Sequence, residues 1–223
     1  MNRAPLVAID GPAGAGKSTV ARLLSARTGL AVLDTGAMYR CVALAAQRKG
    51  IDAENPAPLA DLAANITISF AGDDRRTVLL DGNDVTADIR TLEIGQLASR
   101  LSEHPSVRRV LVAQQQAVIA DGGYILEGRD VTTVVAPDAD LLIFLTASIE
   151  ERARRRWLEV KEQPGGPSLP DVVRDVVARD YRDYSRQDSP LMLAESAIIV
   201  ESFGLTPEQV TDRIANLLAE ARP

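Results

Sequence analysis

The chain has few of the residues that build disulfide-linked or metal-centred proteins. Its 223 residues include one cysteine, Cys41, and one histidine, His104. A lone cysteine excludes an intrachain disulfide and a cysteine metal cluster, and it favours the reducing cytoplasm. His104 stands directly before Pro105, so we expect it at a helix end or on the surface rather than in a catalytic site.

Long apolar runs and an excess of positive charge are missing as well. No stretch approaches the roughly 20 apolar residues of a membrane span, and the first residues lack the pattern of a signal segment. The formal net charge is −6 and the isoelectric point is about 4.9. Because binding to nucleic acid or to an anionic membrane requires a basic surface, we expect neither partner.

What the sequence does contain is a complete phosphate-binding loop. Residues 11–18 match G-x-x-x-x-G-K-[ST], with an apolar run before them and helical spacing after them. In such a loop the backbone N–H groups surround a polyphosphate, Lys17 reaches the β and γ phosphates, and Ser18 offers its hydroxyl to Mg²⁺. The predicted triphosphate-binding residues are Gly11, Pro12, Ala13, Gly14, Ala15, Gly16, Lys17, Ser18 and Thr19.

Short apolar segments alternate with segments of helical spacing along the chain. The apolar segments are residues 6–10, 31–34, 124–127, 141–146 and 197–201. Their length and composition are typical of strands that helices cover on both faces. The alternation predicts an α/β protein: a three-layer P-loop fold with a five-stranded parallel sheet, in one domain over residues 1–223.

Several helix ends carry explicit signals. Gly29 and Gly50 are predicted C-terminal stops. The segments Ser148–Glu151 and Thr206–Gln209 each match a capping box, in which the first and last side chains bond to each other's backbone.

One region breaks the alternation. Residues 66–70 and 77–80 are strand-like, residues 71–76 form a polar connection, and residues 81–84 supply a further turn. Two antiparallel strands do not fit a parallel core. We therefore predict an inserted subdomain over residues 62–92, small, antiparallel and partly helical, on the substrate side. Two helices follow, at about residues 93–103 and 106–120.

Four arginines cluster after the fourth strand, at Arg152, Arg154, Arg155 and Arg156, and a Pro- and Gly-rich stretch follows at residues 163–168. One interpretation is a solvated helix face whose charge nearby glutamates balance. The other is a lid over about residues 150–170. Its guanidiniums would close over the triphosphate and stabilise the charge that develops on the γ-phosphoryl oxygens.

Other basic residues are placed to hold a second anion. Arg40 and Arg129 follow the second and third strands, at the sheet edge where the phosphate loop lies. Two arginines there would hold an acceptor phosphate. One helical face late in the chain carries Arg179, Arg182, Asp183 and Arg186. Surface ion pairs and a bound ligand both explain that spacing.

Several of these segments together resemble the bacterial cytidylate kinase family. They are residues 11–18, 33–40 (LDTGAMYR), 80–85 (LDGNDV), 89–90, 127–130 (EGRD), 134–139 (VVAPDA) and 179–191. The phosphate loop is common to many families, but its combination with the other segments is far more specific. The resemblance covers nearly the whole chain. It implies a P-loop nucleoside monophosphate kinase, a transferase that uses ATP and Mg²⁺ to phosphorylate CMP and dCMP in pyrimidine metabolism.

The resemblance also implies roles for matching residues. The implied catalytic residues are Lys17, Arg129, Arg155 and Arg156. The implied CMP-binding residues are Thr35, Arg40, Ser99, Arg108, Arg129, Asp130, Arg179, Asp183 and Arg186. Within this set Ser99, Arg108 and Asp130 are implied to read cytosine, whose amino group donates and whose carbonyl and ring nitrogen accept. We also expect a monomer, with residues 62–92 as the nucleoside monophosphate subdomain.

Some positions allow more than one interpretation. Asp130 either accepts from the cytosine amino group or only orients Arg129 through a salt bridge. Asp34 and Asp10 are alternative anchors for Mg²⁺ through water. Thr132 stands where the family usually has glycine, and serine is often found in place of Thr35.

Other protein classes fit the sequence less well. An adenylate-type kinase shares the loop and a Thr-Gly-x-Met-x-Arg element, but it carries Asp-Gly-Phe-Pro-Arg where this chain has residues 127–130. A signalling GTPase requires Asn-Lys-x-Asp, which the sequence lacks. Another P-loop small-molecule or nucleoside monophosphate kinase, and an ATP-binding module without phosphotransfer, are the remaining alternatives.

Overall fold

Strand β1 (Ala4–Asp10) lies at the centre of a five-stranded parallel sheet in a computed structural model that describes residues 3–72, 77–162 and 166–221. The other strands are β2 (Ala31–Asp34), β6 (Gly122–Glu127), β7 (Leu141–Thr146) and β8 (Ile198–Glu201), in the order β2-β6-β1-β7-β8. The predicted sheet is confirmed. Because the strands are parallel, their carboxyl ends meet at one edge, which also carries the phosphate loop.

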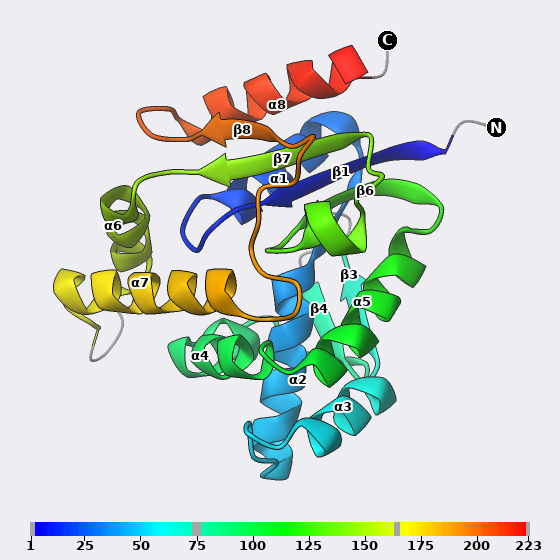
Figure 1. Cartoon of the computed structure of the whole chain (residues 1–223), viewed down its shortest axis with the longest axis vertical. Helices are drawn as coiled ribbons and strands as arrows, with labels where there is room; N and C mark the ends of the chain where they lie inside the picture. The colour runs from blue at the N-terminus through cyan, green and yellow to red at the C-terminus, as the bar shows by residue number, and fades with distance from the viewer. Residues whose placement is uncertain (1–2, 73–76, 163–165, 222–223) are drawn as a thin grey trace.

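Helices cover both faces of this sheet, which gives the predicted three layers (Figure 1). Residues alternate between the faces along β1: Val7 and Ile9 pack with α1 (Lys17–Thr28) and α8 (Pro207–Ala221). Leu6 and Ala8 belong to the second, larger core. That core includes α2 (Thr35–Lys49) and α5 (Pro105–Ile119).

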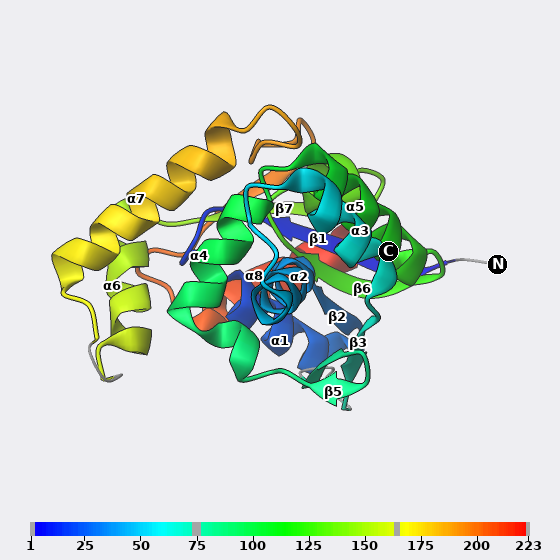
Figure 2. The ribbon, with the colours of Figure 1, turned by 90° about the horizontal axis from the view of Figure 1, so that it is seen from below.

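A smaller antiparallel sheet and two further helices surround α2, which Figure 2 shows nearly end-on. The helices are α3 (Pro56–Asn65) and α4 (Leu92–Leu101), and a short 3₁₀ helix, η1, spans Asp88–Arg90. The strands are β3 (Ile68–Ala71), β4 (Thr77–Leu80) and β5 (Asn83–Asp84), in that order. Their buried side chains, such as Val78, join the core that contains α2.

The turn predicted over residues 81–84 is wrong in its second half. Asn83 and Asp84 form β5, which pairs with β4, so that only Asp81 and Gly82 make the turn. Both turn residues have positive φ, 50° and 81°, as a two-residue hairpin turn requires. The predicted polar connection over residues 71–76 lies mostly outside the described residues.

Helices α6 (Ile149–Val160) and α7 (Leu169–Ser185) pack against each other through a small apolar cluster of their own. They lie to one side of the sheet, near the carboxyl ends of its strands (Figure 1). The Pro- and Gly-rich stretch between them lies partly outside the described residues. A five-residue π-helix, η2 (Val131–Val135), follows β6 and was not predicted.

Most of the predicted helix signals are confirmed. Gly29 and Gly50 end α1 and α2 in the left-handed conformation. In Thr206–Gln209 the N–H of each end residue donates to the other's side chain, at 2.8 and 3.2 Å. His104 precedes α5 as its N-cap residue. Within the described ranges, the helices are all too short or too polar to cross a membrane.

Candidate functional site

The phosphate loop connects the central strand to α1. A Cβ atom on Gly11 would lie 1.9 Å from the carbonyl oxygen of Leu145 in β7, and the φ of Gly11 is 149°, so only glycine fits. Gly16 precedes α1 without a side-chain cap. The free N–H groups at the start of α1 are therefore available to an anion.

Lys17 is buried inside the loop. Its Nζ donates to the carbonyl oxygens of Gly11 and Pro12, at 2.7 and 2.9 Å. Burial, and next the charge of Arg129, lower the pKa of Lys17 well below its ordinary value, against the opposing effect of Glu127. The loop thus holds the Lys17 side chain next to the charged groups Arg129 and Glu127, at the place where an anion would bind.

Ser18 contacts a carboxylate that the sequence analysis did not single out. Its hydroxyl donates to Oε2 of Glu127, the last residue of β6, at 2.8 Å. Burial, and then the nearby Asp34, raise the pKa of Glu127 to about 7. The signal in the sequence was an acidic residue at the carboxyl end of a buried strand, which is where parallel sheets place their ligands.

Oxygen atoms at this point suit Mg²⁺, which prefers a few carboxylate or hydroxyl ligands and completes its shell with water and phosphate. Ser18, Glu127 and Asp34 all line the cavity here. The described residues contain no group of three or more His, Cys, Asp or Glu side chains that would hold a metal alone. The alternative anchor Asp10 is wrong, because its carboxylate accepts from the backbone N–H groups of Val131 and Thr132 instead.

The end of β2 carries a second group of site residues. Asp34 caps α2 by accepting from the N–H of Ala37 at 2.8 Å, and it lies 3.7 Å from the guanidinium of Arg40. The hydroxyl of Thr35 donates to the carbonyl oxygen of Glu127 at 2.7 Å. These contacts hold the carboxyl ends of β2 and β6 together.

Arg129 and Asp130 follow β6, and each forms an ion pair with a different helix. Nε of Arg129 donates to Asp183 of α7 at 2.8 Å. Asp130 forms a buried ion pair with Arg108 of α5. The interpretation that Asp130 only orients Arg129 is therefore wrong, since Asp183 does so. Arg108 also lies over the ring of Tyr39, 5.4 Å from its centre, a favourable cation–π arrangement.

Helix α7 adds guanidinium groups whose charge is only partly balanced. Nε of Arg179 is buried and has no hydrogen-bond partner among the described residues, and the same is true of Nη2 of Arg186. Burial, and then the nearby Arg129, lower the pKa of Arg179 to about 10. Burial would raise the pKa of Asp183, but the surrounding guanidiniums hold it below its usual value. Such a cluster is suited to receive an anion.

Ser99 lies on α4, across the cavity from α7. Its hydroxyl accepts a 3.2 Å hydrogen bond from Nε of Arg182. Arg182 is one of the four residues that the sequence analysis placed on one face of α7. The side chains of the predicted acceptor site therefore come from helices that are distant in sequence.

The four arginines of the predicted lid do not act alike. Arg152 is 4% exposed, donates to the carbonyl oxygen of Ala13 at 2.9 Å and pairs with Asp180 of α7 at 2.7 Å. It fastens α6 to the phosphate loop and does not line the cavity. Its assignment to a set of closing guanidiniums is therefore wrong.

The remaining three arginines line the cavity and form ion pairs on α6. Arg154 and Arg155 both bind the carboxylate of Glu151, at 2.9 and 2.7 Å, and Arg156 binds Glu159 at 2.9 Å. Only half of the predicted capping box is therefore formed. The Ser148 hydroxyl accepts from the Glu151 N–H, but the Glu151 carboxylate binds Arg154 and Arg155 instead of the Ser148 N–H.

Arg155 reaches furthest toward the phosphate loop. It donates to the carbonyl oxygen of Ala15 at 3.2 Å and to the hydroxyl of Ser202 at 2.9 Å. Beside it, Leu205, Pro207 and Val210 form an apolar wall of the cavity that the sequence analysis missed. No local motif marks these residues, because they reach the site only through the parallel pairing of β8.

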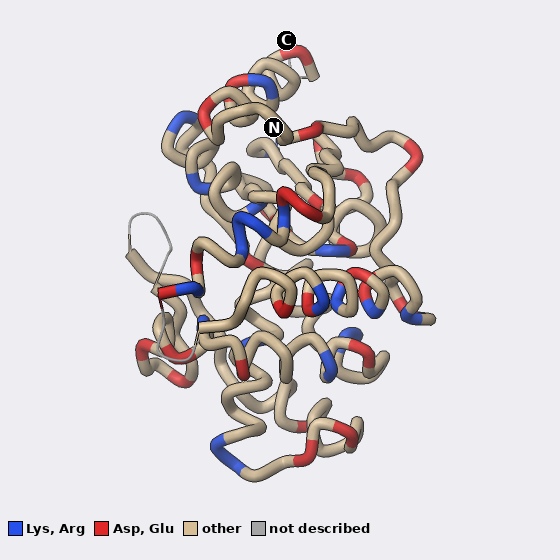
Figure 3. The backbone as a smooth tube through the Cα atoms, turned by 90° about the vertical axis from the view of Figure 1, so that its left-hand side faces the viewer, with Lys and Arg blue, Asp and Glu red and all other residues tan. Residues whose placement is uncertain are grey.

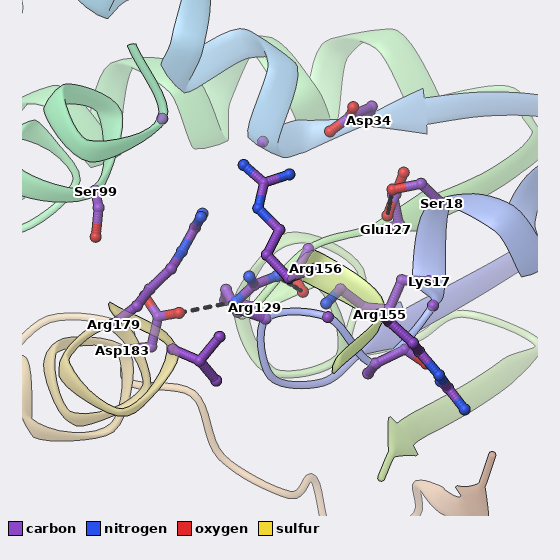
Figure 4. A pocket seen from close by; sticks show the side chains of 18 of the residues that line it. Lys17, Ser18, Asp34, Ser99, Glu127, Arg129, Arg155, Arg156, Arg179 and Asp183 are labelled. Carbon is purple, nitrogen blue, oxygen red and sulfur yellow. Dashed lines mark hydrogen bonds and ion pairs between the residues drawn. The ribbon is translucent and has the colours of Figure 1, made fainter. Parts of the chain in front are cut away.

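Most of these groups surround one cavity of about 830 Å³, in the upper part of the range of about 300–1,000 Å³ typical of ligand sites. Every predicted site residue except Gly11 and Pro12 lines it. Figure 4 shows Ser99, Arg179 and Asp183 at one end, Lys17, Ser18 and Arg155 at the other, and Arg129 between them.

Basic side chains outnumber acidic ones in the lining, although the chain carries a net charge of −6. Elsewhere basic and acidic positions are interspersed along the chain (Figure 3). The positive lining is therefore a property of the cavity and suits anionic ligands.

Comparison with known proteins agrees with this geometry. The family model described as cytidylate kinase matches residues 7–220. A cytidylate kinase of Geobacter sulfurreducens is 47% identical over 219 residues, 98% of this chain and 94% of that protein. One of Pseudomonas fluorescens is 43% identical, over 97% of this chain and 96% of that protein.

A solved structure, that of an uncharacterized protein from Eubacterium ventriosum, shares the fold with a TM-score of 0.52. It has 10% identity, over 97% of this chain and 98% of that one. That structure shows the fold alone; since the family model and the two cytidylate kinases of G. sulfurreducens and P. fluorescens match nearly the whole chain, the protein belongs to the cytidylate kinase family.

Proposed function

We propose that the protein transfers the γ-phosphoryl group of ATP to CMP and dCMP. Family membership supports the reaction, and one observation carries the assignment of the site. Arg40, Arg129 and Arg179 line the same cavity as the phosphate loop and the buried pair Arg108–Asp130. When these three guanidiniums hold the phosphate of CMP, that phosphate lies between the triphosphate of ATP and the pocket for the cytosine base.

ATP binds at the end of the cavity formed by the phosphate loop. The N–H groups of residues 13–19 surround its phosphates, and Lys17 moves from its carbonyl acceptors to the β and γ oxygens. The apolar wall of Leu205, Pro207 and Val210 provides a surface for the purine ring.

The hydroxyl of Ser18 would hold Mg²⁺ together with the nucleotide phosphates, and Glu127 and Asp34 would anchor the ion through water. When bound, it neutralises charge on the phosphoryl oxygens. In the structure the Ser18 hydroxyl donates a hydrogen bond to Glu127, which orients the hydroxyl oxygen in the cavity.

CMP occupies the opposite end. Arg40 and Arg129 hold its phosphate, and Asp183 fixes the direction of Arg129. The unpartnered Nε of Arg179 is a donor for the same phosphate or the sugar. Asp130 accepts from the cytosine amino group, and Ser99 and Arg108 complete the recognition. Thr35 and Arg186 contact the nucleotide near its sugar.

The chemistry requires position and neutralisation rather than a protein nucleophile. An oxygen of the CMP phosphate attacks the γ phosphorus in line, and ADP leaves. Lys17, Arg129 and the lid arginines Arg155 and Arg156 balance the charge on the transferred group. Residues 62–92 form the subdomain that encloses CMP, and residues 150–170 form the lid.

We further propose that the enzyme works as a monomer in the cytoplasm. One chain supplies side chains to both ends of the cavity, and ATP and CMP are nucleotides of the cytoplasm.

The test is ADP release from ATP in a coupled assay with CMP, dCMP, UMP, AMP or shikimate as acceptor. We expect turnover with CMP and dCMP to exceed that with the other acceptors. Faster release with AMP or shikimate would favour a different P-loop kinase. Release that no acceptor stimulates would favour an ATP-binding module without phosphotransfer.

A further inference from the structure

Asp10, the last residue of β1, is a fully buried carboxylate that does not line the cavity. It accepts from the N–H of Val131 at 3.0 Å, and from the N–H and the hydroxyl of Thr132 at 2.8 and 2.6 Å. A buried carboxylate is costly unless donors satisfy its oxygens. These three bonds therefore fix the turn after β6 relative to β1.

The same turn is attached to β1 at a second point. The N–H of Gly128 donates to the carbonyl oxygen of Ile9 at 3.1 Å. A Cβ atom on Gly128 would lie 2.6 Å from the hydroxyl oxygen of Thr35, so the backbone is tightly enclosed there. Arg129 and Asp130 are the two residues between the attachments.

These two residues leave the turn toward different helices. Arg129 binds Asp183 of α7, and Asp130 binds Arg108 of α5. Both contacts depend on the same short backbone segment. A shift of that segment would displace the phosphate-binding arginine and the base-binding carboxylate together.

We propose that Asp10 and Thr132 are positioning residues, which hold Arg129 and Asp130 in register with the phosphate loop. Asp10 is bonded directly to Gly11, the first residue of that loop, so one carboxylate links the donor end of the cavity to the acceptor end. Neither residue touches a nucleotide. The inference rests on the proposed function, because CMP defines the acceptor end.

Thr132 offers the sharper test, because its hydroxyl can be removed while the carboxylate stays. Valine has a similar shape and lacks the donor, whereas serine keeps it. Thr133 provides a matched control in the next position: its hydroxyl oxygen is buried and has no hydrogen-bond partner in the described part of the chain. Replacing that hydroxyl with a methyl group removes no interaction.

The experiment compares Thr132→Val, Thr132→Ser and Thr133→Val with the wild type. It measures KM for CMP and for ATP separately, together with kcat and stability to urea. We expect Thr132→Val to lower kcat/KM for CMP by about tenfold or more and to change KM for ATP by less than about twofold, since small misplacements of reacting groups are costly in rate. Thr132→Ser recovers most of the loss, and Thr133→Val behaves as the wild type.

Three results would overturn the proposal: unchanged kcat/KM for CMP in Thr132→Val, an equal rise in both KM values, or the same loss in Thr133→Val. If the valine variant does not fold, Thr132→Ala takes its place, with Thr133→Ala as its control, since alanine also keeps the N–H and removes the hydroxyl. A wild-type protein without activity on CMP would instead refute the proposed function.

Discussion

The hydroxyl of Ser18 and the carboxylate of Glu127, 109 positions apart in the chain, are joined by a 2.8 Å hydrogen bond. Burial, and then the charge of Asp34, raise the pKa of Glu127 from 4.5 to about 7. A carboxyl group with a raised pKa binds more protons in the folded than in the unfolded protein. The free energy of unfolding therefore decreases as the pH rises between the two pKa values.

We accordingly expect Glu127→Gln to alter the pH dependence of stability in metal-free buffer. Relative to the variant, the wild type loses stability between about pH 4.5 and pH 7, by at most about 3 kcal/mol, the equivalent of that pKa difference. Urea denaturation across this interval measures it, with the exposed Glu220→Gln as control. Parallel curves for wild type and Glu127→Gln would contradict the shift.

Lys17→Ala removes a charge that the proposal places on the transferred phosphoryl group. Turnover falls by about 10²-fold or more, because one lost transition-state contact costs a few kcal/mol. The variant is checked for folding by circular dichroism and then assayed with saturating CMP. A folded variant with near-normal turnover would contradict the assignment of the phosphate loop as the ATP-binding site.

The sequence predicted those features that depend on neighbouring residues. Strands β2 and β7 have the predicted bounds, because a short apolar run between turn signals is a local property. The stops at Gly29 and Gly50 are local in the same way. The two-residue strand β5 is too short to have a pattern, and it exists only because β4 lies beside it.

Choices between competing partners were not predictable. Ser148 and Glu151 match a capping box, but two guanidiniums take the Glu151 carboxylate, since charge-assisted hydrogen bonds are stronger than bonds to a backbone amide. The role of Arg152 depends on Asp180, which reaches it only after α6 and α7 pack. The sequence thus predicted which groups form the site, while the tertiary structure decides which of them pair.

This division of the lid arginines leads to distinct expectations. Arg152→Ala leaves Asp180 largely buried without its partner, and we expect a loss of about 3–5 kcal/mol in stability. Arg155→Ala lowers turnover more than it weakens CMP binding, because lid contacts are completed only on closure.

Arg154, whose side chain is 56% exposed, is the control. Its exposed ion pair contributes about 0–1 kcal/mol, so Arg154→Ala changes stability little. Urea denaturation, kcat and the dissociation constant of CMP separate the three variants. Unchanged turnover in Arg155→Ala, alone and combined with Arg156→Ala, would contradict the lid and favour the interpretation of α6 as a solvated helix.

Base recognition is tested by two substitutions that remove a carboxylate charge from neighbouring ion pairs. Asp130→Asn turns an acceptor for the cytosine amino group into an amide that can donate. We expect kcat/KM for CMP to fall by about 10²-fold or more, since a mismatched buried polar group is strongly disfavoured. The ratio of kcat/KM for CMP to that for UMP should become smaller.

Asp183→Asn instead weakens the ion pair that holds Arg129, a phosphate contact that both substrates share, so it lowers both activities alike. The ratio of CMP to UMP efficiency separates the two effects. If that ratio stays unchanged in Asp130→Asn while both activities fall, Asp130 supports the site only through Arg108, and Ser99 and Arg108 carry the specificity.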